Sequence, residues 1–326
     1  MHHAQQHHVV APTLFLSDAD VASLAQAYAS PTSDAMVPPR SMARGDGIWL
    51  RSLTAVPPTG GHMGCKLIAA SMRARCASYL IALFNQQTMA LSALIDGNRV
   101  TGLRTAATAA LAVDLLAPQR ALRVGVIGAG FEARGALDCL KSVRDVAHVR
   151  VFSPTPASRE RFADSFRPGL DIHAVGSAQE AVQDCDVVIC AARSRDESPV
   201  LQGAWIGPGT TIVSLGSTLP EQREVDPVTM ERAVCIVADM PQEVLHDTGD
   251  AIAAITAGVY VADKLVALSD LVAGRVIPRQ NDSDIVLYKS VGSALQDVVI
   301  AQVLYERARQ QGLGIELPAS IVPVSK

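Results

Sequence analysis

The stretch LRVGVIGAGFEARGAL, residues 122–137, constrains this chain more than any other feature. An apolar strand runs directly into two glycines and an alanine, and a helical pattern follows. This spacing is the G-x-G-x-x-A variant of the dinucleotide fingerprint, in which the first glycine permits a tight turn and the second lets a pyrophosphate approach the backbone. The start of the helix adds unpaired N–H groups and a positive dipole end. We therefore expect a dinucleotide cofactor, and the alternative is a structural glycine turn. The candidate cofactor contacts are Gly128, Gly130, Phe131, Glu132 and Ala133.

A second predicted strand, VRVFS at 149–153, ends where such sites usually hold the ribose. Sites for NAD commonly place Asp or Glu at this point, whereas this chain offers Ser153, Thr155 and Arg159. A carboxylate would repel a 2′-phosphate, but hydroxyls and a guanidinium would attract one. The sequence thus predicts NADPH (NADP) in preference to NAD, which remains possible. The alternative is that Arg159 is only a solvated helix residue.

The two parts of the chain follow different patterns. From residue 122 onwards, predicted strands alternate with helices, which is typical of parallel βαβ units. Before that point, predicted strands are joined by short turns and should pair antiparallel. These earlier strands are expected at 64–71, 79–84 and 89–96. The fold class is therefore α/β, with a dinucleotide-binding parallel sheet and a second, α+β part.

Three helices outside the alternating region are expected. One covers 17–29, with Ser17 or Asp18 as its cap, and a long amphipathic one covers 290–312. An Ala-rich helix is expected at 101–116, after a turn at 96–98, with Thr101 as its N-cap.

Basic residues before the fingerprint are candidates for substrate contacts. Lys66 interrupts an apolar strand, so it either points to solvent or is buried with a lowered pKa that suits proton transfer. Arg104 is placed at the start of the Ala-rich helix, where it could form an anion site with the N-terminal amides. Arg40 is a third candidate. Four other arginines are expected to be surface charges, namely Arg44, Arg51, Arg73 and Arg75.

Composition excludes several classes of protein. A formal net charge of −4 and the lack of a basic stripe argue against a general nucleic-acid binder. No uninterrupted apolar run could span a membrane, and MHHAQQHHVV does not resemble a signal peptide. Six cysteines without CxxC spacing indicate reduced, mostly buried thiols in a cytoplasmic protein. No metal site is expected, and the histidines at positions 2, 3, 7 and 8 are interpreted as part of a frayed tail.

Taken together, the chain resembles the ornithine cyclodeaminase/mu-crystallin family over about residues 36–308. The stretches that carry the resemblance include PPR (38–40), GCKLIA (64–69), GLRTAATAALAVDLLAP (102–118), GVIGAGFEA (125–133), PGTTIVSLGSTLPEQREVD (208–226), HDTGDAI (246–252) and YKSVGSALQD (288–297). The resemblance implies a homodimer of two-domain subunits. It places a substrate and dimerisation domain at 1–118, a Rossmann domain at 119–287, and a C-terminal helix returning to the first domain at 288–326.

The resemblance also implies roles for individual residues. Arg40, Lys66 and Arg104 would surround a substrate carboxylate, while Thr105 and Lys289 would belong to the cofactor site. The chain departs from the usual pattern at Glu132, where glutamine is common, and at His246-Asp247, where Glu-Ser is usual.

Thr218 decides between activities within the family. Ornithine cyclodeaminases carry an aspartate two residues before the proline that aligns with Pro220, and this chain has Thr218 at that position. Threonine cannot act as a base near neutral pH or hold a cationic amine by charge. Ketimine reductases resembling mu-crystallin have a small hydroxyl residue there instead.

The expected activity is the NAD(P)H-dependent reduction of a C=N bond next to a carboxylate, in a cyclic imino acid such as pyrroline- or piperideine-2-carboxylate. Arg40 and Arg104 would hold the carboxylate, Lys66 would donate or relay a proton, and Thr218 would hold a water or the imine nitrogen. Three alternatives stay open: an ornithine cyclodeaminase, an alanine or opine-type dehydrogenase, and a non-catalytic binder of NADPH and a small ligand.

Overall fold

The computed structural model describes residues 7–9, 18–194, 196–316, 321 and 323–324, so His2, His3 and the predicted cap Ser17 lie outside the described residues. The chain divides into two compact units. Unit 1 comprises Met1–Arg104 and Ser293–Lys326, and unit 2 comprises Thr105–Gly292. The compact units differ in definition from the predicted domains, whose boundaries at 118/119 and 287/288 remain a prediction.

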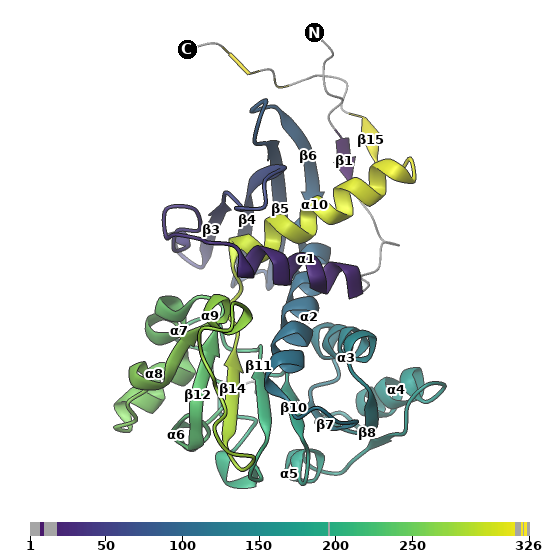
Figure 1. Cartoon of the computed structure of the whole chain (residues 1–326), viewed down its shortest axis with the longest axis vertical. Coiled ribbons are helices and arrows are strands. Elements are labelled where there is room, and N and C mark those ends of the chain that lie inside the picture. Colours follow the sequence, from purple (N-terminus) through teal and green to yellow (C-terminus); the bar gives the residue numbers. More distant parts are fainter. Residues whose placement is uncertain (1–6, 10–17, 195, 317–320, 322, 325–326) are drawn as a thin grey trace. The chain divides into compact units, whose positions relative to one another are not determined.

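Unit 1 contains a seven-stranded sheet of order β15-β1-β6-β5-β4-β3-β2 (Figure 1). Strands β2 to β6 pair antiparallel, as the short turns predicted, while β1 pairs parallel with β6. Because residues 7–9 form β1, the interpretation of His7 and His8 as part of a frayed tail is wrong. The strands are β1 (His7–Val9), β2 (Ser41–Arg44), β3 (Ile48–Ala55), β4 (His62–Ser71), β5 (Cys76–Asn85), β6 (Leu91–Asp96) and β15 (Ile315–Glu316).

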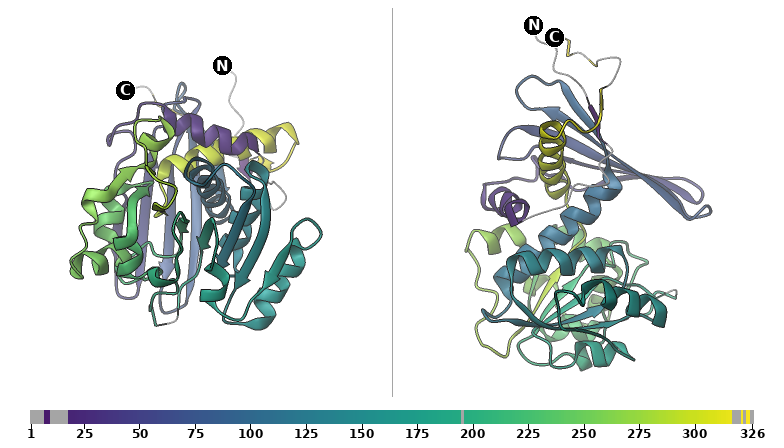
Figure 2. Two further views of the ribbon diagram at one scale, coloured as in Figure 1. Left: turned by 60° about the horizontal axis from the view of Figure 1, so that its bottom comes forward. Right: turned by 90° about the vertical axis from the view of Figure 1, so that its right-hand side faces the viewer.

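Two helices cover the sheet of unit 1. Helix α10 (Ala294–Gln310) contacts β3, β4 and β5, and α1 (Asp18–Ala29) contacts α10. Figure 2 shows both helices on one side of the sheet. The buried side chains of α10 are mostly apolar, but Gln296 and Asp297 are fully buried as well. This pair brings polar groups into the interior of the unit.

Helix α2 (Gly97–Leu116) begins four residues earlier than predicted, because Gly97 and Asn98 of the predicted turn form its first residues. The Asp96 carboxylate accepts a hydrogen bond from the Asn98 N–H at 2.9 Å, as a capping side chain does. Thr101 is therefore not the N-cap; its hydroxyl donates to the Gly97 carbonyl at 2.7 Å from within the helix. Arg104 lies about two turns into the helix, so its predicted pairing with N-terminal amides is also wrong.

Unit 2 contains a parallel eight-stranded sheet of order β13-β12-β14-β11-β10-β7-β8-β9, which confirms the predicted βαβ alternation (Figure 1). Its strands are β7 (Leu122–Ile127), β8 (Val146–Phe152), β9 (Ile172–Ala174), β10 (Val187–Cys190), β11 (Thr211–Ser214), β12 (Ala233–Ala238), β13 (Leu265–Ala267) and β14 (Ile285–Lys289). Its further helices are α3 (Phe131–Val143), α4 (Pro156–Phe166), α5 (Ala178–Val182), α6 (Pro227–Arg232), α7 (Pro241–Asp247), α8 (Gly249–Thr256) and α9 (Leu268–Val272), with 3₁₀ turns at Gly203–Trp205 and Ala262–Lys264.

The strand order of unit 2 reverses next to β7. Strands β8 and β9 follow on one side of it, whereas the chain then crosses to β10 on the other. Right-handed crossovers place α3 and α4 on one face of the sheet and α5 on the opposite face. Open α/β sheets bind ligands at the carboxyl ends of the strands where the order reverses. Gly128 directly follows β7 at that point.

Several simpler expectations can be compared with the fold. The six cysteines are free, and four of them are buried. Arg51 is not a surface charge: its side chain is buried, and its guanidinium lies 5.1 Å from the ring centroid of Trp49. Among the described residues, no helix is long and apolar enough to cross a membrane.

Candidate functional site

The loop between β7 and α3 has the backbone that the fingerprint predicts. Gly128 has a φ of +112°, and a Cβ there would lie 2.4 Å from the Ala191 carbonyl oxygen, so only glycine fits. At Gly130 a Cβ would meet no atom within 4 Å, which leaves open space above the backbone. Helix α3 starts there without a side-chain cap, and Ala133 is buried in its first turn. These residues fit the pyrophosphate of a dinucleotide.

The ribose-binding candidates meet at the carboxyl end of β8. The Arg159 guanidinium donates to the Ser153 carbonyl oxygen at 3.0 Å and lies 5.6 Å from the ring centroid of Phe152. Thr155 is exposed just before α4, and its side chain does not cap that helix. The structure therefore brings two hydroxyls and a guanidinium to the position where a carboxylate would favour NAD.

Two of the three predicted basic residues of unit 1 contact a carboxylate that was not among the predicted site residues, that of Asp297. Lys66 Nζ lies 2.6 Å from Asp297 Oδ2, and Arg104 Nε donates to Asp297 Oδ1 at 3.2 Å. The side chains of Lys66 and Asp297 are 2% and 0% exposed. Arg40 is close enough for its charge to act on Lys66. We call Arg40, Lys66, Arg104 and Asp297 the Lys66 cluster.

Three further polar residues hold this cluster in place. Arg104 Nη1 donates to Gln296 Oε1 at 2.9 Å, and Gln296 Nε2 donates to the Tyr28 hydroxyl at 2.7 Å. Lys66 Nζ also donates to the Thr101 hydroxyl at 3.4 Å. Strand β4 and helices α1, α2 and α10 thus position one buried set of charges.

The protonation of Lys66 responds to this environment. Its pKa is lowered from 10.5 to about 8, chiefly by burial; the Asp297 carboxylate opposes the shift, and the charges of Arg104 and Arg40 add to it. Lys66 is buried, and its lowered pKa is the one expected for a buried lysine in this strand. A lysine with this pKa is protonated at neutral pH and gives up its proton more readily than a solvated one.

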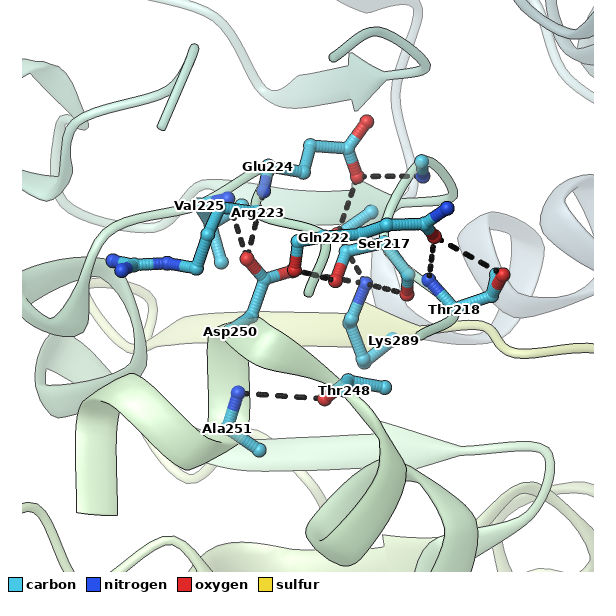
Figure 3. A network of polar contacts seen from close by, with 12 residues as sticks. Ser217, Thr218, Gln222, Arg223, Glu224, Val225, Thr248, Asp250, Ala251 and Lys289 are labelled. Atoms are coloured by element: carbon cyan, nitrogen blue, oxygen red, sulfur yellow. Dashed lines mark hydrogen bonds and ion pairs between the residues drawn. The ribbon is translucent and has the colours of Figure 1, made fainter. Parts of the chain in front are cut away.

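In unit 2, Glu224 links the carboxyl ends of two neighbouring strands (Figure 3). Its fully buried carboxylate accepts hydrogen bonds from the Ala192 N–H at 2.9 Å, the Gly216 N–H at 2.8 Å and the Ser214 hydroxyl at 2.6 Å. Burial raises the pKa of Glu224 to about 7, although the nearby Lys289 charge and these hydrogen bonds oppose the shift. Glu224 therefore fixes the backbone after β10 and β11.

Lys289, a predicted cofactor contact, is fully buried within the same network (Figure 3). Its Nζ lies 3.1 Å from Asp250 Oδ2 and donates to the Ser214 hydroxyl at 3.0 Å and the Ser217 carbonyl at 2.9 Å. Asp250 Oδ1 in turn accepts the Glu224 N–H at 2.7 Å. We call Ser214, Ser217, Glu224, Asp250 and Lys289 the strand-end network.

Thr218 lies in the turn that this network supports. Its N–H donates to Gln222 Oε1 at 3.0 Å, and its hydroxyl lies 3.4 Å from the same oxygen. The Ser217 hydroxyl donates to the Gln222 carbonyl at 2.7 Å. The half-buried Thr218 is thus held on a braced turn just beyond β11.

The remaining candidates are scattered over unit 2. Thr105 is buried on α2, Phe131 is about half exposed and Glu132 is partly buried at the start of α3. His246, one of the two residues that depart from the family pattern, is exposed on α7, whereas Asp250, which follows them, joins the strand-end network. Asp250 and Asp297 each lie next to apolar residues in the first turn of a helix, and this was the available signal for the missed contacts.

Comparison with known proteins agrees with this geometry. A family model described as the ornithine cyclodeaminase/mu-crystallin family matches residues 53–312. The chain is 28% identical to a Delta(1)-pyrroline-2-carboxylate reductase of Bacillus cereus over 293 residues, covering 88% of this chain and 85% of that protein. It is 31% identical to the ketimine reductase mu-crystallin of Mus musculus over 226 residues, covering 69% of this chain and 68% of that protein.

The same fold occurs in a solved structure. The Delta(1)-pyrroline-2-carboxylate reductase of Thermococcus litoralis, in complex with NADH and L-proline, aligns with a TM-score of 0.86 and 27% identity. The alignment covers 96% of this chain and 100% of that one.

Proposed function

This chain belongs to the ornithine cyclodeaminase/mu-crystallin family, and we propose that it is a nicotinamide-dependent reductase of a C=N bond next to a carboxylate. A cyclic ketimine such as pyrroline-2-carboxylate or piperideine-2-carboxylate is its substrate, and the product is the cyclic amino acid. The observation that carries the proposal is the buried Lys66, with its lowered pKa, beside two arginines. The similarity to pyrroline-2-carboxylate and ketimine reductases supports it.

Each member of the Lys66 cluster has a role in this reaction. Arg40 and Arg104 hold the substrate carboxylate, which also orients the imine carbon. Lys66 donates or relays a proton to the imine nitrogen, because an iminium is the better hydride acceptor and a lysine of pKa about 8 can supply the proton. Asp297 keeps Lys66 protonated at neutral pH.

The reduced nicotinamide, when bound, supplies the hydride. The loop at Gly128, Gly130 and Ala133, with Phe131 and Glu132 at the start of α3, holds the pyrophosphate. Thr105 lies at the nicotinamide, and Thr218 holds a water or the imine nitrogen. Lys289 supports that end of the site from within the strand-end network rather than by reaching a ligand, since its ammonium is enclosed by Asp250, Ser214 and Ser217.

We propose NADPH as the preferred cofactor. The hydroxyls of Ser153 and Thr155 and the guanidinium of Arg159 are suited to a 2′-phosphate, and no carboxylate occurs within residues 153–159. The similar Thermococcus litoralis enzyme was solved with NADH, so the preference requires a direct comparison of the two cofactors.

We also propose that the protein is a cytoplasmic homodimer. Apolar side chains of unit 1 are exposed around a hollow of about 650 Å³ beside β3, β4 and β5, including Ile48 at 57% and Leu50 at 49% exposure. Covering such a surface with a second copy would remove it from water. Six free cysteines suit a reducing compartment.

The experiment that tests the proposed function follows the absorbance of reduced nicotinamide. Purified protein is mixed with NADPH or NADH and either pyrroline-2-carboxylate, piperideine-2-carboxylate, or pyruvate with ammonia or methylamine. We expect oxidation with a cyclic imine, faster with NADPH, and a loss of roughly 10²-fold or more in Lys66→Ala. No change in absorbance with either imine, together with release of ammonia from ornithine in the presence of NAD, would show a cyclodeaminase and overturn the proposal.

A further inference from the structure

A cluster outside the proposed active site combines two imidazoles and a carboxylate. His148 lies on β8, His173 lies on the edge strand β9, and Asp171 immediately precedes β9. The pairing of Val149 with Ile172 places His148 level with Asp171 and Arg150 level with His173. Because side chains alternate between the faces of a strand, His148, Asp171 and His173 all project from the same face of the sheet.

The side chains of His148 and His173 both contact Asp171, in agreement with this strand register. His148 Nδ1 lies 2.7 Å from Asp171 Oδ2, and His173 Nε2 lies 2.9 Å from Asp171 Oδ1. The two imidazole rings are 5.3 Å apart between centroids. One ligand atom from each residue lies within 4.8 Å of the others. The two histidines therefore aim a ring nitrogen at one carboxylate from two different strands.

We propose that His148, Asp171 and His173 form a binding site for a divalent transition-metal ion, of which Zn²⁺ is the representative. Two imidazole nitrogens and a carboxylate oxygen are the donor types that Zn²⁺ takes, at about 2.0–2.2 Å from the ion. In a tetrahedral site such donors stand about 3.3 Å apart. The two nitrogen–oxygen separations, 2.7 and 2.9 Å, need to open by only about half an ångström, which exposed side chains can do.

The exposure and charge of the cluster suit an ion of this kind. The side chains of His148, Asp171 and His173 are 33%, 61% and 62% exposed, so water can complete the coordination. Calcium or magnesium would be a poor match, because these ions prefer sets of oxygen ligands.

The site would join the edge strand to the body of the sheet. Strand β9 has three residues and pairs with β8 alone among the described strands, so a bound ion adds a cross-link between them. His148 lies five residues before Ser153, about 16 Å along an extended strand, so this ion would not touch the cofactor. The proposal is thus independent of the proposed function.

The test is calorimetric titration of Zn²⁺ into the full-length, chelator-treated protein. All variants carry alanine at the N-terminal histidines His2, His3, His7 and His8, which could otherwise bind metal on their own. We expect about one equivalent of saturable binding and a loss of affinity of about tenfold or more in both Asp171→Asn and His173→Gln. The matched control, His246→Gln, replaces an exposed histidine elsewhere on unit 2 and should bind as the parent does.

Co²⁺ provides a second readout. Its visible absorption should show nitrogen–oxygen coordination in the parent and in His246→Gln and disappear in His173→Gln. Absence of saturable Zn²⁺ binding would overturn the proposal, as would equal affinity in all of the variants. A circular dichroism spectrum of each variant establishes that lost binding is not lost folding.

Discussion

Replacing Asp297 by Asn should move the pH dependence of catalysis through its effect on Lys66. The Asp297 carboxylate is fully buried, 2.6 Å from Lys66 Nζ and 3.2 Å from Arg104 Nε. Asn has nearly the same shape but no charge. The substitution therefore leaves two buried cations without the carboxylate that they share.

The size of the effect follows from the distance. At 2.6 Å and an effective dielectric constant of about 20, the attraction between the two charges is about 6 kcal/mol. Structural relaxation and water entry would compensate for much of this lost attraction, but a shift of one unit in the pKa of Lys66 requires only about 1.4 kcal/mol. We therefore expect the pKa of Lys66 to fall from about 8 by at least about one unit. The free energy of unfolding should fall by about 3–5 kcal/mol, as when one partner of a buried ion pair is removed.

The assay is kcat/KM for a cyclic imine as a function of pH. If Lys66 supplies the proton, the parent loses activity above pH about 8, and Asp297→Asn should lose it above about 7 or lower. Asp297→Glu keeps the charge and serves as the matched control, and the alkaline limb of its pH profile should lie close to that of the parent. Both proteins see the same substrate, so ionisation of the imine cannot account for a difference.

Arg104→Gln should shift the pKa of Lys66 in the opposite direction, and it provides a test even if Asp297→Asn does not fold. The Arg104 charge lowers the pKa of Lys66, so its removal should shift the alkaline limb upward even though substrate binding weakens. An alkaline limb that stays in place in both variants, or moves the other way, would refute the assignment of that limb to Lys66.

Three further predictions concern unit 2. Gly128→Ala should weaken binding of the dinucleotide by at least about tenfold, because a Cβ at this positive φ would lie 2.4 Å from the Ala191 carbonyl oxygen. Fluorescence titration measures the affinity, and unchanged affinity would contradict the assignment of this loop to the pyrophosphate. Arg159→Ala should lower kcat/KM with NADPH much more than with NADH, by about tenfold or more, whereas equal losses would make Arg159 only a helix residue. The pKa of Glu224 is raised from 4.5 to about 7, so between these pH values the folded state binds a proton that the unfolded state has lost. The free energy of unfolding should therefore fall as pH rises from about 4.5 through 7, by up to about 3 kcal/mol. Urea titrations should show this slope in the parent and not in Glu224→Gln.

The parts of the fold that sequence patterns predicted are the local ones. The apolar strand, the glycines and the helix around residue 130 lie within sixteen residues, and each follows from local sterics and hydrophobic periodicity. The βαβ alternation of unit 2 was predictable for the same reason. By contrast, the start of α2 involves one hydrogen bond that the Asp96 carboxylate accepts from the Asn98 N–H, and with this earlier start Thr101 and Arg104 lie inside the helix.

The missed residues belong to contacts between distant parts of the sequence. Asp297 meets Arg104 across 193 residues, and no local pattern reveals which buried carboxylate faces which cation. Lys289 was interpreted as a cofactor contact, but its ammonium faces Asp250, Ser214 and Ser217. Arg51 was expected at the surface because alternation along a strand does not show which face is covered.

Hydride transfer to the imine carbon is tested by product analysis with labelled cofactor. The protein is incubated with pyrroline-2-carboxylate and NADPH carrying deuterium at the transferred C4 position, and the product is examined by mass spectrometry and NMR. We expect proline with one deuterium at its α-carbon, formed at least about 10²-fold more slowly by Lys66→Ala. Absence of proline, or proline without the label, would contradict hydride transfer to the imine carbon.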